Sequence, residues 1–201
     1  MPNWCYNSLT ITGDKKELKK FKKLVFTKNY YKDDPEGEDL EFDFDKIIAY
    51  PKQFAEADEL CHKLRKEGVA WDKIPKDGFN SGGYEWCIKN WGTKWNARVT
   101  NFEEDTTGDL VYDFDTAWSP AIPVITEASK LFPTLHFDLH YTEEGMGFKG
   151  DTTFHNGEVD DDCRDVEVLH CPDEDCGDCW DEEDDTECPS CGKEGVKEVN
   201  Y

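Results

Sequence analysis

The chain has 201 residues, of which 37% are hydrophobic and 13% aromatic, and its formal net charge is -23. This length allows one medium-sized domain with a hydrophobic core plus a small appendage, and the aromatic content argues against a disordered chain. No apolar run approaches the ~18 residues of a transmembrane helix, and the first residues lack the basic and apolar regions of a signal peptide. We therefore expect a globular cytoplasmic protein without a membrane segment.

The negative charge is concentrated at the C-terminal end. Residues 151–201 hold 19 acidic and 3 basic residues, whereas the first 150 residues hold 27 acidic and 20 basic residues. Direct binding of nucleic acid is disfavoured, because it depends on Lys and Arg at the phosphates. The acidic segment instead suits solubility, a basic protein partner or imitation of a polyanion.

The first predicted elements are a strand and a helix. Residues 4–12 alternate between two faces and are rich in β-forming residues, which predicts a strand. Gly13 ends this strand, and Asp14 followed by Glu17 is a capping-box signature for a helix that begins there. Leu18 and Phe21 begin the apolar face of this helix, and lysines occupy most of its other face.

A long insertion is predicted to separate this helix from the next core strand. The insertion spans residues 27 to about 94 and contains a polar helix near residues 54–66. Two β-rich segments follow at 96–102 and 110–116, and the turn residues Thr107-Gly108-Asp109 lie between them. This arrangement predicts a hairpin with a longer loop.

A second helix and two further strands complete the predicted domain. The helix begins at Ser119-Pro120 and ends before Pro133, because proline cannot continue the helical hydrogen bonds. Residues 135–142 alternate as a half-buried strand, and residues 147–154 supply another. Without the insertion, the order is β-α-β-β-α-β with one added strand. This order predicts an α+β, ferredoxin-like fold.

Three separated segments carry a family resemblance. They are Met1-Pro2-Asn3-Trp4-Cys5-Tyr6-Asn7, Trp91-Gly92-Thr93-Lys94-Trp95-Asn96 and Thr116-Ala117-Trp118-Ser119-Pro120-Ala121-Ile122-Pro123. Over about residues 1–155 the chain resembles the YubB-type ferredoxin-like domains of phages and conjugative plasmids. The resemblance implies a ferredoxin-like fold. It also implies that the gene belongs to a mobile genetic element and that the protein acts in the cytoplasm of a bacterial host. It implies no activity.

The C-terminal cysteines predict a metal site. Nine cysteines without an export pattern favour metal ligation over disulfides. The pair Cys188 and Cys191, followed by Gly192, is a zinc-knuckle pattern, since two thiolates spaced by two residues can face one ion and the glycine permits a tight turn. Cys176 is the third expected ligand, and the spacing leaves the fourth open.

The fourth ligand is expected to be Cys171 or Cys179, which gives a closed, structural site for Zn²⁺, with iron as the alternative metal. This part of the chain is similar to zinc ribbons and rubredoxin-like modules. We expect residues 1–156 to form the ferredoxin-like domain, residues 157–164 an acidic linker, and residues 165–201 an acidic zinc ribbon.

Other polar residues do not combine into a catalytic pattern. His136 and His140 are predicted to share a strand face. They are interpreted as surface or interface residues or, alternatively, as a histidine metal site. Glu85, Asp113 and Asp115 are carboxylates without an identifiable nucleophile or base partner in the sequence. We therefore assign no catalytic residue and favour a non-enzymatic protein.

Tryptophans are concentrated between residues 84 and 95. Trp86, Trp91, Trp95 and the more distant Trp118 are interpreted as packing residues or, alternatively, as a surface that stacks a ligand or partner. Burial of these rings favours the first interpretation, and rings exposed around a concavity favour the second.

Together these patterns predict a phage or plasmid accessory protein that binds a host protein, with a structural zinc site and an acidic surface that imitates a polyanion. The partner is expected to be basic or nucleic-acid-binding, and a defence factor is one version of it. The alternative is a module that binds a small molecule, a nucleotide or single-stranded nucleic acid, or an unrecognised enzyme, using the aromatic cluster at 84–95 and the sheet.

Overall fold

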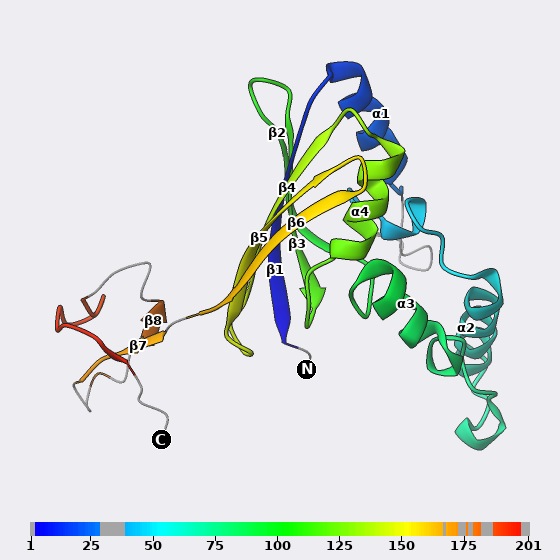
Figure 1. The fold of residues 1–201 in the computed structure, drawn as a ribbon. Helices are drawn as coiled ribbons and strands as arrows, with labels where there is room; N and C mark the ends of the chain where they lie inside the picture. Colours follow the sequence, from blue (N-terminus) through cyan, green and yellow to red (C-terminus); the bar gives the residue numbers. More distant parts are fainter. Residues whose placement is uncertain are drawn as a thin grey trace.

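The computed structural model describes residues 3–28, 39–166, 168–172, 176, 179–181 and 187–197. A six-stranded antiparallel sheet forms the centre of the main domain, with helices on one face, and a small module follows at the C-terminal end (Figure 1). The elements are β1 Trp4–Thr12, α1 Lys15–Val25, η1 Phe44–Lys46, α2 Lys52–Lys66, η2 Trp71–Lys73, η3 Phe79–Ser81, α3 Gly83–Trp91, β2 Arg98–Glu104, β3 Leu110–Ala117, α4 Ile122–Leu131, β4 His136–Glu143, β5 Phe148–His155, β6 Glu158–Asp165, β7 Val168–His170, β8 Cys179–Asp181 and β9 Val196–Lys197.

The strand order confirms the predicted fold class. The large sheet has the order β2-β3-β1-β4-β5-β6, and its neighbouring strands are antiparallel. The first four strands with α1 and α4 form the β-α-β-β-α-β plan of ferredoxin-like domains. Two strands, β5 and β6, extend the sheet beyond β4, where the sequence predicted one. The three short strands β7, β8 and β9 form a separate sheet.

The prediction of an acidic linker at residues 157–164 is wrong. Residues Glu158–Asp165 form strand β6, which pairs with β5 along its whole length. Asn156 and Gly157 both have positive φ, so they make the tight turn that returns the chain beside β5. The Asp161 carboxylate accepts hydrogen bonds from Tyr141 Oη at 3.0 Å and Thr152 Oγ1 at 2.6 Å, which offset the cost of placing an acid there.

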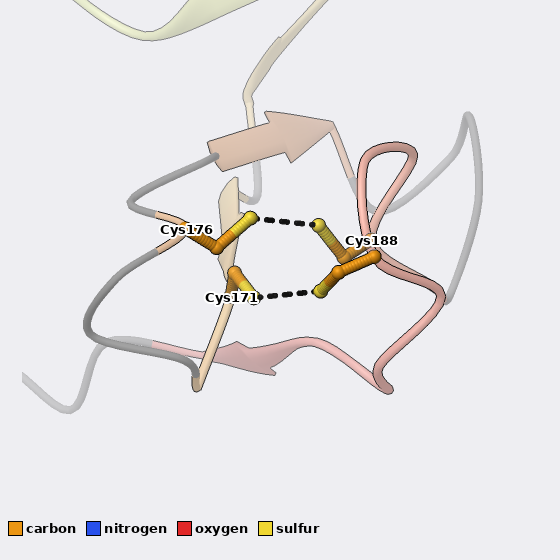
Figure 2. Close-up of side chains that lie close together, drawn as sticks. Cys171, Cys176 and Cys188 are labelled. Atoms are coloured by element: carbon orange, nitrogen blue, oxygen red, sulfur yellow. Dashed lines mark hydrogen bonds between the residues drawn. The ribbon is translucent and has the colours of Figure 1, made fainter.

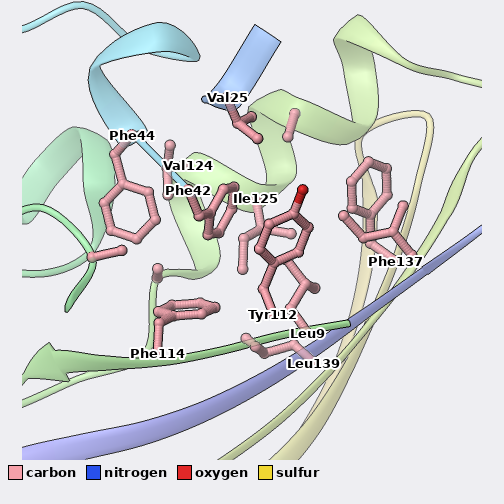
Figure 3. Packing of buried hydrophobic residues seen from close by; sticks show 14 of the residues in the cluster. Leu9, Val25, Phe42, Phe44, Tyr112, Phe114, Val124, Ile125, Phe137 and Leu139 are labelled. Atoms are coloured by element: carbon pink, nitrogen blue, oxygen red, sulfur yellow. The ribbon is translucent and has the colours of Figure 1, made fainter. Parts of the chain in front are cut away.

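Alternation along the strands directs one face of the sheet toward α1 and α4. The predicted cap is present, because the Asp14 carboxylate accepts hydrogen bonds from the backbone N–H groups of Lys16 and Glu17. Phe21 of α1 is fully buried, and its ring lies 5.3–6.3 Å from four other aromatic rings. Figure 3 shows this aromatic core between the sheet and the helices. Its labelled residues are Leu9, Val25, Phe42, Phe44, Tyr112, Phe114, Val124, Ile125, Phe137 and Leu139.

The insertion carries two helices beside one end of the sheet (Figure 1). The predicted polar helix is α2. The tryptophan-rich stretch, for which no element was predicted, forms α3, and Gly92 ends it with φ 85°. The Trp91 ring is buried against the core, and its Nε1 donates a hydrogen bond to the Ile48 carbonyl at 2.9 Å. Among the helices that the structure describes, none combines the length and the apolar character needed to cross a membrane.

Candidate metal centre and aromatic cavity

Four cysteines converge in the C-terminal module (Figure 2). The sulfurs of Cys171 and Cys191 lie 3.4 Å apart, and those of Cys176 and Cys188 lie 3.7 Å apart. All four sulfurs lie within 4.8 Å of one another. Cys171 directly follows β7, whereas Cys188 and Cys191 belong to one turn, so segments distant in sequence build the cluster.

The turn from Cys188 to Gly192 has the geometry of a metal-binding knuckle. Gly192 has φ 70°, and its N–H donates to the Cys188 carbonyl at 2.8 Å. The Cys188 N–H donates to the Lys193 carbonyl at 2.7 Å. Burial raises the pKa of the Cys188 thiol, but hydrogen bonds from the backbone of Cys191 and Ser190 and from the thiols of Cys191 and Cys176 together hold that pKa below its ordinary value. The turn therefore favours the thiolate, the form that binds metal.

The sulfur separations fit a shared ion. A tetrahedral site with metal–sulfur bonds of about 2.3 Å places its sulfurs about 3.8 Å apart, whereas a disulfide has a sulfur separation of about 2.05 Å. Four thiolates are the donor set of structural zinc and of some iron sites. The four cysteines could thus hold one metal ion. The set that the structure brings together contains Cys171, and the side chain of Cys179 lies outside the described residues.

Three other cysteines are buried in the main domain, of which Cys61 lies in α2 and Cys5 and Cys87 have raised pKa values. Burial raises the pKa of the Cys5 thiol to about 12, with smaller effects from its neighbours. Burial and the nearby Asp58 charge raise the pKa of Cys87 to about 12. Both side chains are therefore neutral thiols at physiological pH and are unsuited to act as nucleophiles, which require the thiolate.

The four predicted tryptophans do not form one surface. Trp91 is buried, and Trp86 packs against it with ring centroids 5.4 Å apart. Trp95 and Trp118 are exposed by 39% and 37%. The ammonium of Lys94 lies 4.4 Å from the Trp95 ring centroid and 4.8 Å from that of Trp118. Two rings therefore pack the insertion, and two are available to solvent.

A cavity of about 600 Å³ lies between the insertion and the sheet, and we call it the aromatic cavity. Sequence reasoning did not identify it, because its walls come from distant segments. Its lining includes the exposed Trp95 and the buried Cys87 and Trp91. Its lining residues are Trp4, Asp45, Tyr50, Ala55, Asp58, Phe79, Cys87, Trp91, Lys94, Trp95, Asn96, Ala97 and Arg98.

The predicted histidines and carboxylates form cross-strand pairs on the sheet. The ring of His136 stacks on His155 at 4.3 Å, whereas His140 Nδ1 contacts the Asp151 carboxylate. Asp113 accepts a hydrogen bond from Ser8 Oγ at 2.7 Å. Asp115 lies 3.6 Å from Arg98, and Glu85 is an exposed residue of α3. The structure does not bring Glu85 together with the two sheet aspartates.

Comparison with known proteins gives one family match. Residues 90–188 match the family model described as the ferredoxin-like domain in Api92-like protein. The matched segment runs from the end of α3 through β6 to Cys188 and includes three of the four clustered cysteines. No curated protein matches the chain.

Among solved structures, the crystal structure of a protein api92 from Yersinia pseudotuberculosis matches with a TM-score of 0.41. The identity is 12%, over 82% of this chain and 98% of that chain. A likeness of this size supports no transfer of function.

Proposed function

We propose that the chain is a non-enzymatic accessory protein of a phage or plasmid that binds a basic host protein. The observation that carries this proposal is the acidic edge of the sheet. Edge strand β6 contains five carboxylates in eight residues, and Asp160 and Asp162 are exposed on it. This edge leads into the acidic C-terminal module, within a segment of 19 acidic and 3 basic residues.

Charges on an edge strand also have a protective role, because they prevent pairing with other strands. That role explains some acids on β6, but it does not require the acids of the following module. Exposed acidic groups attract basic partners and increase their rate of association. Binding of a basic protein therefore accounts for both regions together.

Zinc is the metal we propose for the four-cysteine cluster. Four thiolates around one Zn²⁺ leave no position for a substrate water, so the ion acts as a structural support. Its net charge with four thiolates is negative, which adds to the acidic surface. Iron is the alternative with the same ligands. Metal analysis of the purified protein separates the two, with about one zinc per chain expected.

Capture from bacterial lysate tests the function. We expect a basic host protein to bind the tagged chain at low salt and to dissociate at high salt, because exposed charges are screened. The double variant Asp160→Asn/Asp162→Asn should weaken capture, and it leaves the hydrogen-bonded Asp161 intact. The matched control Asp72→Asn/Glu85→Gln removes the same charge from exposed positions in the insertion. Equal capture by both variants would contradict the proposal.

A further inference from the structure

The aromatic cavity has features that protein packing alone does not require. Its volume of about 600 Å³ lies within the usual range for small-molecule sites. Five aromatic side chains line it, from the sheet, the insertion and the segment that leads into β2. They are Trp4, Tyr50, Phe79, Trp91 and Trp95. Such walls suit a ligand with a flat apolar body.

The insertion side of the cavity presents hydrogen-bond acceptors. The Asp58 carboxylate accepts hydrogen bonds from Tyr50 Oη at 3.2 Å and from the Phe79 N–H at 2.9 Å. Asp45 accepts from the Tyr50 N–H at 2.6 Å. Burial and the Asp58 charge raise the pKa of Tyr50, so its hydroxyl stays a donor. A carboxylate has about four acceptor positions, and the two bonds to Asp58 leave capacity for a donor from a ligand.

Two cations, Lys94 and Arg98, also line the cavity. Lys94 follows α3, and Arg98 begins β2. The Lys94 ammonium lies over the rings of Trp95 and Trp118, and the Arg98 guanidinium lies over the Trp4 ring and 3.6 Å from Asp115. The side chain of Arg98 is 66% exposed, which leaves its guanidinium accessible to an anionic group. The lining of the cavity therefore contains both hydrogen-bond acceptors and cations.

We propose that the aromatic cavity binds a free mononucleotide. The base stacks on the exposed ring of Trp95, its N–H donors face Asp58, and its phosphate pairs with Lys94 and Arg98. This ligand carries hydrogen-bond donors on its base and an anion on its phosphate, so it matches both the acceptors and the cations of the lining.

The charge distribution favours a free nucleotide over a nucleic acid strand. A strand would extend beyond the cavity across the sheet, where it would meet the carboxylates of Asp113, Asp115 and Asp151. Binding of a polyanion depends on many cations, and the chain has a net charge of -23. Two cations at one cavity are sufficient for a single phosphate.

Binding is inferred to be non-covalent. The side chain of the cavity that could act as a thiol nucleophile is Cys87, whose pKa is raised to about 12 by burial and by Asp58. It is a neutral thiol and contributes apolar surface. This inference goes beyond the proposed function and is independent of it, because the acidic strand β6 does not line the cavity.

Titration calorimetry on the whole metal-loaded chain tests the inference, with AMP, GMP, CMP and UMP as ligands. We expect saturable binding of at least one mononucleotide. The matching nucleoside, which lacks the phosphate, and ribose 5-phosphate, which lacks the base, should each bind about tenfold more weakly or worse. Trp95→Ala should weaken binding about 5- to 150-fold, as for the loss of a stacked ring. Arg98→Ala should weaken binding of the nucleotide but leave binding of the nucleoside unchanged.

Trp71→Ala is the matched control. Trp71 is 75% exposed and also lies beneath a cation, Arg65, but it does not line the cavity. Trp71→Ala should leave the affinity for the mononucleotide unchanged. Asp160→Asn/Asp162→Asn, which tests the proposed function separately, should also leave it unchanged. Thermal melts confirm that each variant is folded. The inference is overturned if no mononucleotide binds at millimolar concentration, if Trp95→Ala and Trp71→Ala behave alike, or if a short oligonucleotide or an aromatic amino acid binds more tightly.

Discussion

The sulfurs of Cys171 and Cys191 lie 3.4 Å apart although the two residues are twenty positions apart in the sequence. This contact joins the segment after β7 to the turn that contains Cys188, and Cys176 completes the cluster. Since the module is small and rich in acidic residues, a metal ion held by the four cysteines would supply the interaction that joins these segments.

Cysteine substitutions should identify the ligands. Cys171→Ser removes one of four converging thiolates, so we expect the metal to be lost readily to a chelator. Cys179→Ser should retain the metal, and the exposed Cys163, which is outside the cluster, provides the control Cys163→Ser. Metal content after dialysis against chelator measures each result. Loss of metal from Cys179→Ser with retention in Cys171→Ser would reverse the assignment of the fourth ligand.

Metal removal should unfold the module and spare the main domain. The metal-binding free energy of such a module is largely its folding free energy, whereas the large sheet has an aromatic core of its own. Hydrogen exchange should therefore become fast in β7 and β9 after chelation and stay slow in β1 and β4. A loss of protection in β1 on metal removal would show that the two parts depend on each other.

The sequence predicted most of the main domain because its elements carry local signals. The alternation in β1, the cap at Asp14 and the proline that ends α4 act within a few residues. Strand β6 lacked such a signal, since five acids in eight residues indicate a solvated linker. Its contacts, from Tyr141 and Thr152 to Asp161 and from its own Arg164 to Asp151, exist only after β4 and β5 are paired.

The candidate sites show the same limit. Spacing predicted three of the four cysteines that cluster, because a knuckle is a local structure, and it left the fourth open. The aromatic cavity forms only when the insertion folds against the sheet, which places the ring centroids of Trp4 and Trp95 6.2 Å apart. No periodicity in the sequence specifies that contact. The exposure of each tryptophan also depends on how the insertion packs against the sheet.

Phe21 should be a major source of core stability. Its fully buried ring contacts four aromatic rings. Phe21→Ala leaves a cavity that the rigid sheet cannot close, and we expect the free energy of unfolding to fall by about 3–5 kcal/mol. Leu24→Ala on the same helix, at a 36% exposed position, should change it by about 0.5 kcal/mol or less. Urea unfolding of both variants checks this difference.

Gly92 should resist substitution for two separable reasons. Its φ is 85°, and a Cβ at this position would lie 2.4 Å from Pro123 Cδ and 2.9 Å from the Pro120 carbonyl oxygen. Gly147 has φ 70°, and a Cβ added there would meet no atom within 4 Å. Gly147→Ala should therefore cost about 1 kcal/mol from the backbone alone, and Gly92→Ala should cost more. Equal losses in thermal unfolding would mean that α4 shifts to relieve the contact.

The Asp151 carboxylate should make stability depend on pH in the acid range. A hydrogen bond from the Arg164 guanidinium, at 2.9 Å, holds the pKa of Asp151 below its usual value, with a further contribution from His140. A carboxyl whose pKa is lowered by folding stabilises the folded state above its unfolded pKa, about 3.9. That stability is lost as pH falls through the lowered pKa.

We therefore expect Asp151→Asn to reduce the free energy of unfolding at pH 7 by about 0.5–1 kcal/mol, the usual size for a partly exposed pair. The difference from the unmodified chain should shrink as the pH falls below about 4, because the native carboxyl then becomes neutral as well. Asp160→Asn, at an exposed position of β6, is the control and should have little effect at either pH. Urea titrations across this range measure the difference in the free energy of unfolding. A difference that stays constant with pH would mean that Asp151→Asn perturbs packing and that loss of the Arg164 ion pair does not cause the destabilisation.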